Sequence, residues 1–208
     1  MDFDIIIPWR DNGCPYQLRN FKYCYKYYSS LSIPIIGQSD TENFNRSQAR
    51  NDGVYKSKKS NLVIIDSDNV VSLDLIIKGL KLLNKGMIIK PFTSIHYLNE
   101  KATLNFINGI NPLTINDYDT TYLLPNQLDI RNSGGIYIIK RDTWEDLGGM
   151  SESFDGWGRE DTEFNLRLEN KYRPITFLKG NNYHLYHPQT RIPSKNNIEL
   201  LNRVRGEL

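Results

Sequence analysis

Several features that mark secreted, membrane-bound or zinc-binding proteins are scarce in this chain of 208 residues. It has only two cysteines, Cys14 and Cys24, which suit neither a disulfide framework nor a zinc site, so we expect reduced thiols. The longest apolar runs, such as Ile5–Ile7, are a few residues long, whereas a membrane span needs roughly 20. The N-terminus carries Asp2 and Asp4 and no basic stretch, which argues against a signal peptide. We therefore expect no membrane span and a cytoplasmic protein.

The charge of the chain is nearly balanced, with 26 Lys and Arg against 24 Asp and Glu and a net charge of +2. Nucleic-acid-binding domains usually carry a basic stripe, so this balance argues against nucleic acid as a partner. The unusual number is aromatic, because 13 Tyr, 8 Phe and 3 Trp make up 12% of the chain. Aromatic faces suit stacking on sugars or bases, although an Ile-, Lys-, Asn- and Tyr-rich composition from an AT-rich genome would explain the same excess.

Short β-branched runs alternate with amphipathic stretches over residues 1–90, which predicts an α/β domain with a mostly parallel sheet. Residues 91–129 show little periodicity and are expected to form long excursions outside the core, and the chain from Pro188 onward is a polar tail. Ligands of such sheets bind beyond the carboxyl ends of the strands. The predicted strands are 3–8, 33–37, 61–65, 87–89, 136–139, 174–178 and 183–186, and the predicted helices are 16–30, 43–59, 72–83, 141–147 and 160–170.

Asp66 and Asp68 stand where a predicted buried strand opens into a loop. Two carboxylates at this spacing can hold a divalent cation, and hard oxygen ligands suit Mg²⁺ or Mn²⁺ together with phosphate oxygens. A turn or helix-cap pair is the alternative, because Asp-x-Asp is common in such positions.

The segment Gly156-Trp157-Gly158-Arg159-Glu160-Asp161 places a tryptophan between two glycines at the start of a predicted helix. The glycines free the loop to take unusual backbone angles, so that the tryptophan can stand over a ligand. A carboxylate at this point can act as a general base or bind hydroxyls. Paired acids at a helix start also serve as caps, but capping does not explain the tryptophan.

His184 and His187 lie in one short segment near the predicted last strand. Either could add a nitrogen ligand to a metal held by Asp68, which would favour Mn²⁺ over Mg²⁺. Residues three apart face opposite sides of a strand, so both can bind only if the segment turns. Structural histidines are the alternative.

Two further segments, Pro8-Trp9-Arg10 and Phe44-Asn45-Arg46, each place an aromatic residue and an arginine beside the expected ligand crevice. An arginine can pair with a diphosphate and an aromatic ring can stack on a base. Ordinary surface salt bridges would account for each arginine taken alone.

In this order the segments resemble the catalytic domain of the β-1,4-galactosyltransferases. They are also similar to the related polypeptide N-acetylgalactosaminyltransferases and family-two glycosyltransferases. The most specific block is Gly-Trp-Gly-x-Glu-Asp, and the resemblance runs over about residues 3–188. The matching segments are Ile5-Ile6-Ile7-Pro8-Trp9-Arg10, Phe44-Asn45-Arg46, Ile65-Asp66-Ser67-Asp68, Gly134-Gly135, Gly156-Trp157-Gly158-Arg159-Glu160-Asp161 and His184-x-x-His187.

The resemblance implies the GT-A nucleotide-diphospho-sugar transferase fold, with a Rossmann-like, mostly parallel central sheet flanked by helices. It implies a catalytic domain over residues 1–190, with a nucleotide-binding half at about 1–90, an acceptor half at about 91–190 and a tail at 191–208. The implied activity is an inverting, metal-dependent transfer of a hexose or N-acetylhexosamine from a UDP-sugar to an acceptor hydroxyl. The implied cofactor is Mn²⁺, with Mg²⁺ as the alternative.

The resemblance also implies roles for individual residues. Asp161 would be the catalytic base, with Glu160 beside it, and Trp157, Glu160 and Arg159 would bind the acceptor. Asp68 and His187 would bind the metal, with His184 as a weaker ligand. The implied donor and nucleotide contacts are Pro8, Trp9, Arg10, Phe44, Arg46, Asp66, Ser67 and Trp157.

Some features depart from the family pattern. Arg159 replaces a small residue that is common before the Glu-Asp pair, and residues 91–129 match no known acceptor-binding segment. Without an anchor or stem, a bacterial or viral cytoplasmic enzyme is the expectation. The alternatives are a sugar nucleotidyltransferase on a related fold, an inactive carbohydrate-binding relative, and a transferase acting on modified DNA. The basic residues Lys56, Lys58, Lys59, Arg203 and Arg205 leave the last alternative open, but the charge balance gives it little support.

Overall fold

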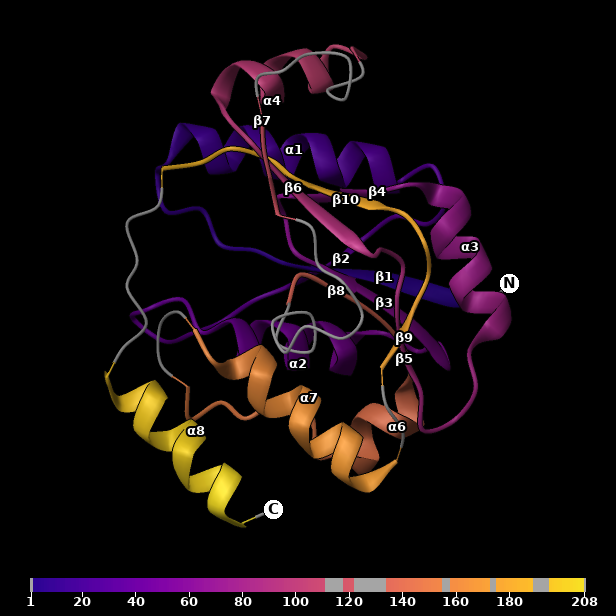
Figure 1. The fold of residues 1–208 in the computed structure, drawn as a ribbon, viewed down its shortest axis with the longest axis vertical. Coiled ribbons are helices and arrows are strands. Elements are labelled where there is room, and N and C mark those ends of the chain that lie inside the picture. The colour runs from indigo at the N-terminus through magenta and orange to yellow at the C-terminus, as the bar shows by residue number, and fades with distance from the viewer. Residues whose placement is uncertain are drawn as a thin grey trace.

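A computed structural model describes residues 2–110, 118–121, 134–154, 158–172, 175–188 and 195–207. These residues form a six-stranded sheet, a smaller four-stranded sheet and helices that pack on both sides of the larger sheet (Figure 1). The strands of the larger sheet, in spatial order, are β2 (Ile35–Gly37), β1 (Phe3–Pro8), β3 (Asn61–Ile65), β8 (Ile136–Lys140), β5 (Ile88–Lys90) and β9 (Thr176–Phe177).

The larger sheet is mostly parallel, as predicted. β1 pairs in parallel with β2 and β3, and β5 pairs in parallel with β9. β8 lies between β3 and β5 and is antiparallel to both. All strands except β8 therefore end at one edge of the sheet, and β8 begins there.

Both faces of the central strands are buried, because the strands are continuous apolar runs. Ile5 and Ile7 point into one cluster and Ile6 into the other. The first cluster is covered by α1 (Pro15–Tyr28), α3 (Leu73–Leu82) and α4 (Glu100–Ile107). The second is covered by α2 (Arg46–Lys56), α6 (Arg141–Asp146) and α7 (Glu160–Lys171). Figure 1 shows these two groups of helices on opposite sides of the sheet.

The second sheet contains β4 (Asn69–Val71), β10 (Asn181–His184), β6 (Ser94–Leu98) and β7 (Tyr118–Thr121), in that order. The expectation that residues 91–129 lie outside the core was wrong for β6 and α4. Phe92, Ile95 and Ala102 belong to the first apolar cluster. Buried polar residues in β6, Ser94 and His96, interrupt the apolar pattern that would have marked the strand.

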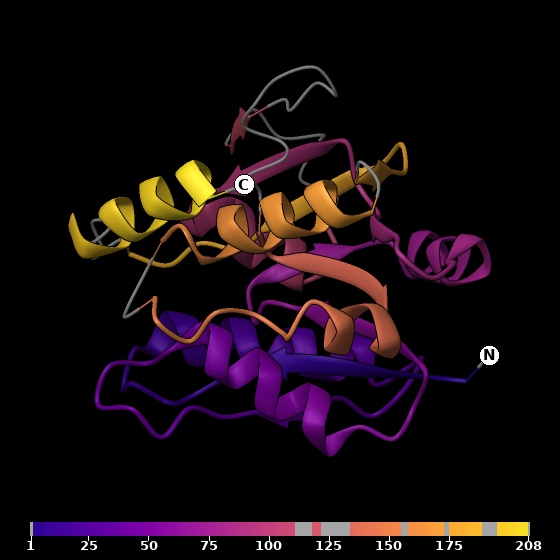
Figure 2. The ribbon, with the colours of Figure 1, turned by 90° about the horizontal axis from the view of Figure 1, so that it is seen from below.

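The predicted tail contains a helix, α8 (Lys195–Glu207), that packs against α7. Figure 1 shows the two helices running in nearly the same direction at the bottom of the view, and Figure 2 shows them next to each other at the same level. Leu201 is 2% exposed in this contact region, so the helix has a buried apolar residue of its own. Within the described residues no helix is long and apolar enough to cross a bilayer.

Candidate active site

The residues singled out in the sequence gather at the edge of the larger sheet where its parallel strands end. Pro8 ends β1, Asp66 follows β3 and Lys90 ends β5. The amide of Asp66 donates to the carbonyl of Gly135, just before β8 begins, at 2.7 Å. The site thus lies where open α/β sheets bind their ligands.

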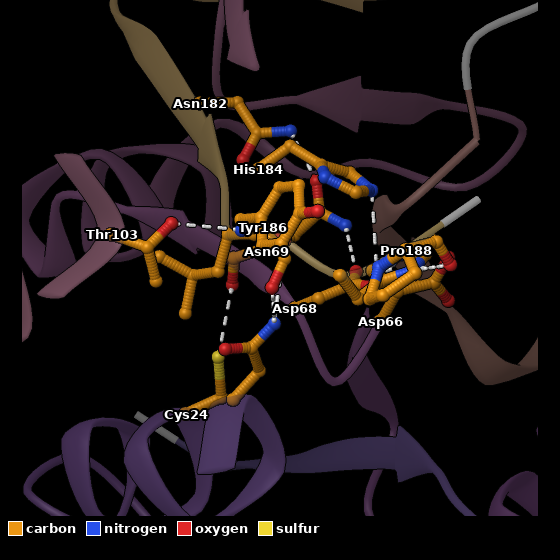
Figure 3. Close-up of polar contacts among 12 residues, drawn as sticks. Cys24, Asp66, Asp68, Asn69, Thr103, Asn182, His184, Tyr186 and Pro188 are labelled. Atoms are coloured by element: carbon orange, nitrogen blue, oxygen red, sulfur yellow. Dashed lines mark hydrogen bonds and ion pairs between the residues drawn. The ribbon is translucent and has the colours of Figure 1, made fainter. Parts of the chain in front are cut away.

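Strand pairing in the smaller sheet brings Asp68 and the two histidines together. β4 pairs with β10 so that Asn69 lies opposite His184, and the amide of Leu185 donates to the carbonyl of Asp68 at 2.8 Å. β10 ends at His184, so the chain is free to turn before His187. The Nε2 atoms of His184 and His187 lie 3.8 and 3.3 Å from Oδ2 of Asp68. Figure 3 shows the His184 ring directed toward Asp68.

A short chain of amides orients the Asp68 carboxylate. Asn182 donates to Oδ1 of Asn69 at 2.6 Å, and Asn69 donates to Oδ1 of Asp68 at 2.7 Å (Figure 3). Oδ1 is therefore occupied, and Oδ2 faces the histidines. Burial acts to raise the pKa of Asp68, but His184 and His187 outweigh it and hold that pKa well below its ordinary value.

This cluster fits a divalent transition metal. Asp68, His184 and His187 each offer one ligand atom, and these atoms lie within 4.8 Å of one another. Nδ1 of His187 donates to the carbonyl of Pro188 at 3.2 Å, which fixes the tautomer with Nε2 free to ligate. One carboxylate oxygen with two imidazole nitrogens suits Mn²⁺ better than Mg²⁺, whose preferred ligands are oxygens.

A second cluster surrounds Asp161, and a buried arginine connects it to Asp66. The guanidinium of Arg50, with no exposed surface, donates to both oxygens of Asp66 at 2.8 and 3.1 Å. It also donates to Oδ1 of Asp161 at 3.0 Å. The Tyr137 hydroxyl donates to the same Oδ1 at 2.5 Å. The ammonium of Lys90 lies 4.0 Å from the centre of the Tyr137 ring.

The charges around Asp161 keep it ionised. Burial acts to raise the pKa of Asp161, but Arg50, Lys90 and the Tyr137 hydrogen bond outweigh it and hold the pKa below its ordinary value. The pKa of Asp66 is raised, because burial outweighs the attraction of Arg50. Asp161 therefore has the charge that a proton acceptor needs.

Glu160 is more enclosed than an acceptor-binding residue is expected to be. Its side chain is buried, and it accepts from Arg46 at 3.2 Å and from the amide of Gly158 at 3.0 Å. Burial, reinforced by Asp161, raises its pKa. The contact with Arg46 links the predicted donor side of the site to the start of α7.

Two of the predicted nucleotide residues border a cavity of 690 Å³ beyond the ends of β1 and β2. Trp9 and Arg10 line it, and Trp9 also stacks on Phe21, with ring centres 4.5 Å apart. The guanidinium of Arg10 donates to the carbonyls of Thr41 and Glu42 and lies over the Phe44 ring. Arg10 therefore fixes the loop before α2 as well as lining the cavity.

Three other predicted residues are not drawn into these clusters. Trp157 lies outside the described residues. Ser67 is in the turn between β3 and β4 and is partly buried. Arg159 is exposed and has a left-handed backbone, with φ of 79°.

The sequence reasoning missed three residues of the Asp161 cluster: Arg50, Tyr137 and Lys90. Arg50 lies one turn after Arg46 in the predicted helix 43–59, so the two side chains share a face. Lys90 directly follows the predicted strand 87–89, at the edge where ligands bind. These positions could have marked both residues as candidates from the sequence. Only the fold shows that their side chains are buried together.

The chain is similar in sequence to known glycosyltransferases. Residues 27–187 match the model of the family described as "Glycosyltransferase like family 2". A xylosylprotein 4-beta-galactosyltransferase of Caenorhabditis elegans is 27% identical over 189 residues, which cover 85% of this chain and 53% of the relative.

Solved structures share the fold at low sequence identity. A mutant Drosophila β-1,4-galactosyltransferase 7, in complex with manganese, UDP-Gal and xylobiose, matches with a TM-score of 0.62 and 18% identity, covering 96% of this chain and 78% of that one. GalNAc-T7 with UDP, GalNAc and Mn²⁺ matches with a TM-score of 0.63 and 13% identity, covering 98% and 48%. TarS 1–349 of S. aureus with UDP-GlcNAc matches with a TM-score of 0.61 and 12% identity, covering 100% and 66%.

The fold is that of the GT-A glycosyltransferases. The chain belongs to the glycosyltransferase-like family 2, because the family model covers most of its length. The expected family and fold are thereby confirmed. The chain spans about half of the length of its Caenorhabditis elegans relative.

Proposed function

We propose that this chain transfers a hexose or N-acetylhexosamine from a UDP-sugar to an acceptor hydroxyl by a single inverting displacement. The observation that carries the proposal is the placement of two clusters at one sheet edge. The first is the candidate metal site of Asp68, His184 and His187, and the second holds the ionised carboxylate of Asp161. Family membership and neighbours solved with UDP-sugars support the same donor class.

In the proposed reaction Asp161 removes the proton from the acceptor hydroxyl. The acceptor oxygen forms a bond to the anomeric carbon, and the bond from that carbon to the diphosphate oxygen breaks with its electron pair leaving on UDP. The attack comes from the side opposite UDP, so an α-linked donor gives a β-linked product. A positioned base contributes about 10²–10⁴-fold to such a reaction.

The remaining predicted residues take supporting roles in this proposal. Asp68, His184 and His187 would hold Mn²⁺, which when bound neutralises charge on the diphosphate. Pro8, Trp9, Arg10, Phe44, Arg46, Asp66 and Ser67 would form the nucleotide side, and Glu160 and Arg159 the acceptor side. The proposal assigns nucleotide binding to about residues 1–90 and acceptor binding to about 91–190, with the metal ligands drawn from both halves.

A parallel donor screen tests the proposal. Purified protein is incubated with Mn²⁺ and UDP-Gal, UDP-Glc, UDP-GalNAc or UDP-GlcNAc, and UDP release is measured together with the melting temperature. We expect one donor to raise the melting temperature because it binds only the folded chain. Asp68→Ala should abolish that shift, while Asp161→Asn should keep the shift and lose transfer.

The two variants separate donor binding from chemistry. If no UDP-sugar shifts the melting temperature of the wild type, the donor assignment is wrong. If Asp161→Asn still transfers sugar at the wild-type rate, the base lies elsewhere. The exposed residue Lys81 supplies a control, since Lys81→Ala should change neither readout.

A further inference from the structure

The two oxygens of the Asp161 carboxylate have different surroundings. Oδ1 accepts from both the Tyr137 hydroxyl and the Arg50 guanidinium, at 2.5 and 3.0 Å. Among the described residues, no side chain or amide donates to Oδ2. One oxygen is therefore held by the protein, and the other remains able to accept a proton.

Gly134 provides the space that Oδ2 occupies. A Cβ atom added at Gly134 would lie 1.9 Å from Oδ2 of Asp161, far inside contact distance. The lack of a side chain at Gly134 is therefore a steric condition for this orientation of the carboxylate.

The two groups that hold Oδ1, and the lysine that packs against one of them, come from three separate elements. Arg50 comes from α2 and Tyr137 from β8, and Lys90, at the end of β5, lies against the Tyr137 ring. The side chains of Arg50, Tyr137 and Lys90 have no exposed surface, so their positions are fixed by packing. The charged and titratable groups that act on Asp161 are Arg50, Lys90, Tyr137, Arg46, Asp66 and Glu160.

We propose that Arg50, Tyr137 and Lys90 are positioning residues for Asp161: Arg50 and Tyr137 fix Oδ1, all three keep the carboxylate charged, and Oδ2 is left as the proton-accepting atom. The inference rests on the proposed function, in which Asp161 is the base. Arg50 also binds Asp66, so the same guanidinium fixes the position of the Asp161 carboxylate relative to the end of β3. Protonation of the carboxylate ends activity on the acid side of the pH profile, and the three positive or donating groups move that limit to lower pH.

The pH dependence of kcat/KM tests the inference. Tyr137→Phe keeps the ring and removes one donor, and Lys90→Met keeps the chain length and removes the ammonium. Each should move the acid limb upward by about one pH unit, because each removes a group that favours the charged carboxylate. The matched control is Tyr172→Phe, since the Tyr172 hydroxyl is buried and has no partner among the described residues. Its acid limb should stay at the wild-type pH.

Gly134→Ala tests the assignment of Oδ2. We expect transfer to fall by about 10²-fold or more, as for loss of a positioned base, while the donor still raises the melting temperature. Gly206→Ala is the control, because a Cβ there meets no atom within 4 Å. Full transfer by Gly134→Ala would overturn the assignment.

The outcomes separate this inference from the proposed function. If the wild type transfers sugar and the acid limb is the same in Tyr137→Phe and Lys90→Met, the inference is wrong and the function stands. If the wild type transfers no sugar from any donor, the proposed function fails. The Asp161 carboxyl can then be titrated by ¹³C NMR, assigned with Asp161→Asn. An unchanged titration in Tyr137→Phe overturns the charge-holding role directly.

Discussion

Lys90 is a lysine without exposed surface, and its burial makes stability depend on pH. Burial lowers the pKa of its ammonium from 10.5 to about 7. Between these values the unfolded chain holds a proton that the folded chain has released. The free energy of unfolding should therefore rise with pH, by up to about 1.4 kcal/mol per unit from this residue. This contribution is complete above the pKa of Lys90 in the unfolded chain, 10.5. It is lost progressively as the pH falls from there through the pKa in the folded chain, about 7.

The change that tests this is Lys90→Met, measured by urea unfolding at pH 7, 8 and 9. The variant should lose the part of the pH slope that Lys90 supplies. Lys81→Met, at an exposed position of α3, should keep the wild-type slope. Equal slopes in the wild type and Lys90→Met would contradict the expected pKa.

At the scale of single residues, the sequence predicted the chemically distinctive groups and missed those that look ordinary. Asp68, His184 and His187 were expected at one site, and the structure brings them together. Arg50 and Lys90 resemble surface cations in the sequence. Their burial depends on contacts between distant elements, which no local pattern records.

At the scale of an element, the start of α7 carries backbone strain. Arg159 has φ of 79°, a left-handed conformation that costs a residue with a Cβ atom about 1–2 kcal/mol. Arg159→Gly should raise the free energy of unfolding by about 1 kcal/mol and the melting temperature by about 2–4 °C. Scanning calorimetry measures both.

The function of the Arg159 charge can be separated from this strain. Arg159→Ala keeps the strained backbone and removes the cation, so it should give no stabilisation. If Arg159 binds the acceptor, both variants should raise the KM for the acceptor equally. If Arg159→Gly is stabilised but has an unchanged KM for the acceptor, the backbone strain at Arg159 is confirmed and its role in acceptor binding is excluded.

The central strands were predictable because they are continuous apolar runs, and β3 has the predicted bounds of 61–65. β4 and β6 were not predicted, for a physical reason. β4 is only three residues long, and β6 buries Ser94 and His96. Buried polar side chains that form hydrogen bonds inside a small sheet interrupt the alternation of apolar and polar residues on which strand prediction depends.

At the scale of the whole molecule, the α/β layering follows from the alternation of elements in residues 1–90, but the position of the last helix does not. α8 was read as a polar tail because its residues are mostly charged or amide-bearing. Its docking depends on Leu201 and on Asn197, which is 2% exposed. Only the folded chain places these residues against α7 and the loop before it.

Asn197 ties the C-terminal helix to the candidate active site. Its side-chain amide donates to the carbonyl of Gly158 at 3.0 Å, and the amide of Gly158 donates to Glu160. Asn197→Ala should free this carbonyl and increase amide hydrogen exchange in the peptide covering 158–164. The rate of transfer should fall several-fold, because one lost hydrogen bond costs about 1 kcal/mol.

The neighbouring residue supplies the matched control, because Asn196 is exposed on the same helix. Asn196→Ala makes the same Asn-to-Ala change on the same helix as Asn197→Ala, with nearly the same effect on helix propensity. It should change neither the amide hydrogen exchange at 158–164 nor the rate of sugar transfer. A general loss of helix docking would instead affect α7 as a whole and lower the melting temperature. Faster exchange at 158–164 in Asn197→Ala alone, with the melting temperature within a few degrees of wild type, would establish α8 as a support for the acceptor side. Equal effects of the two variants would show that α8 has only a structural role.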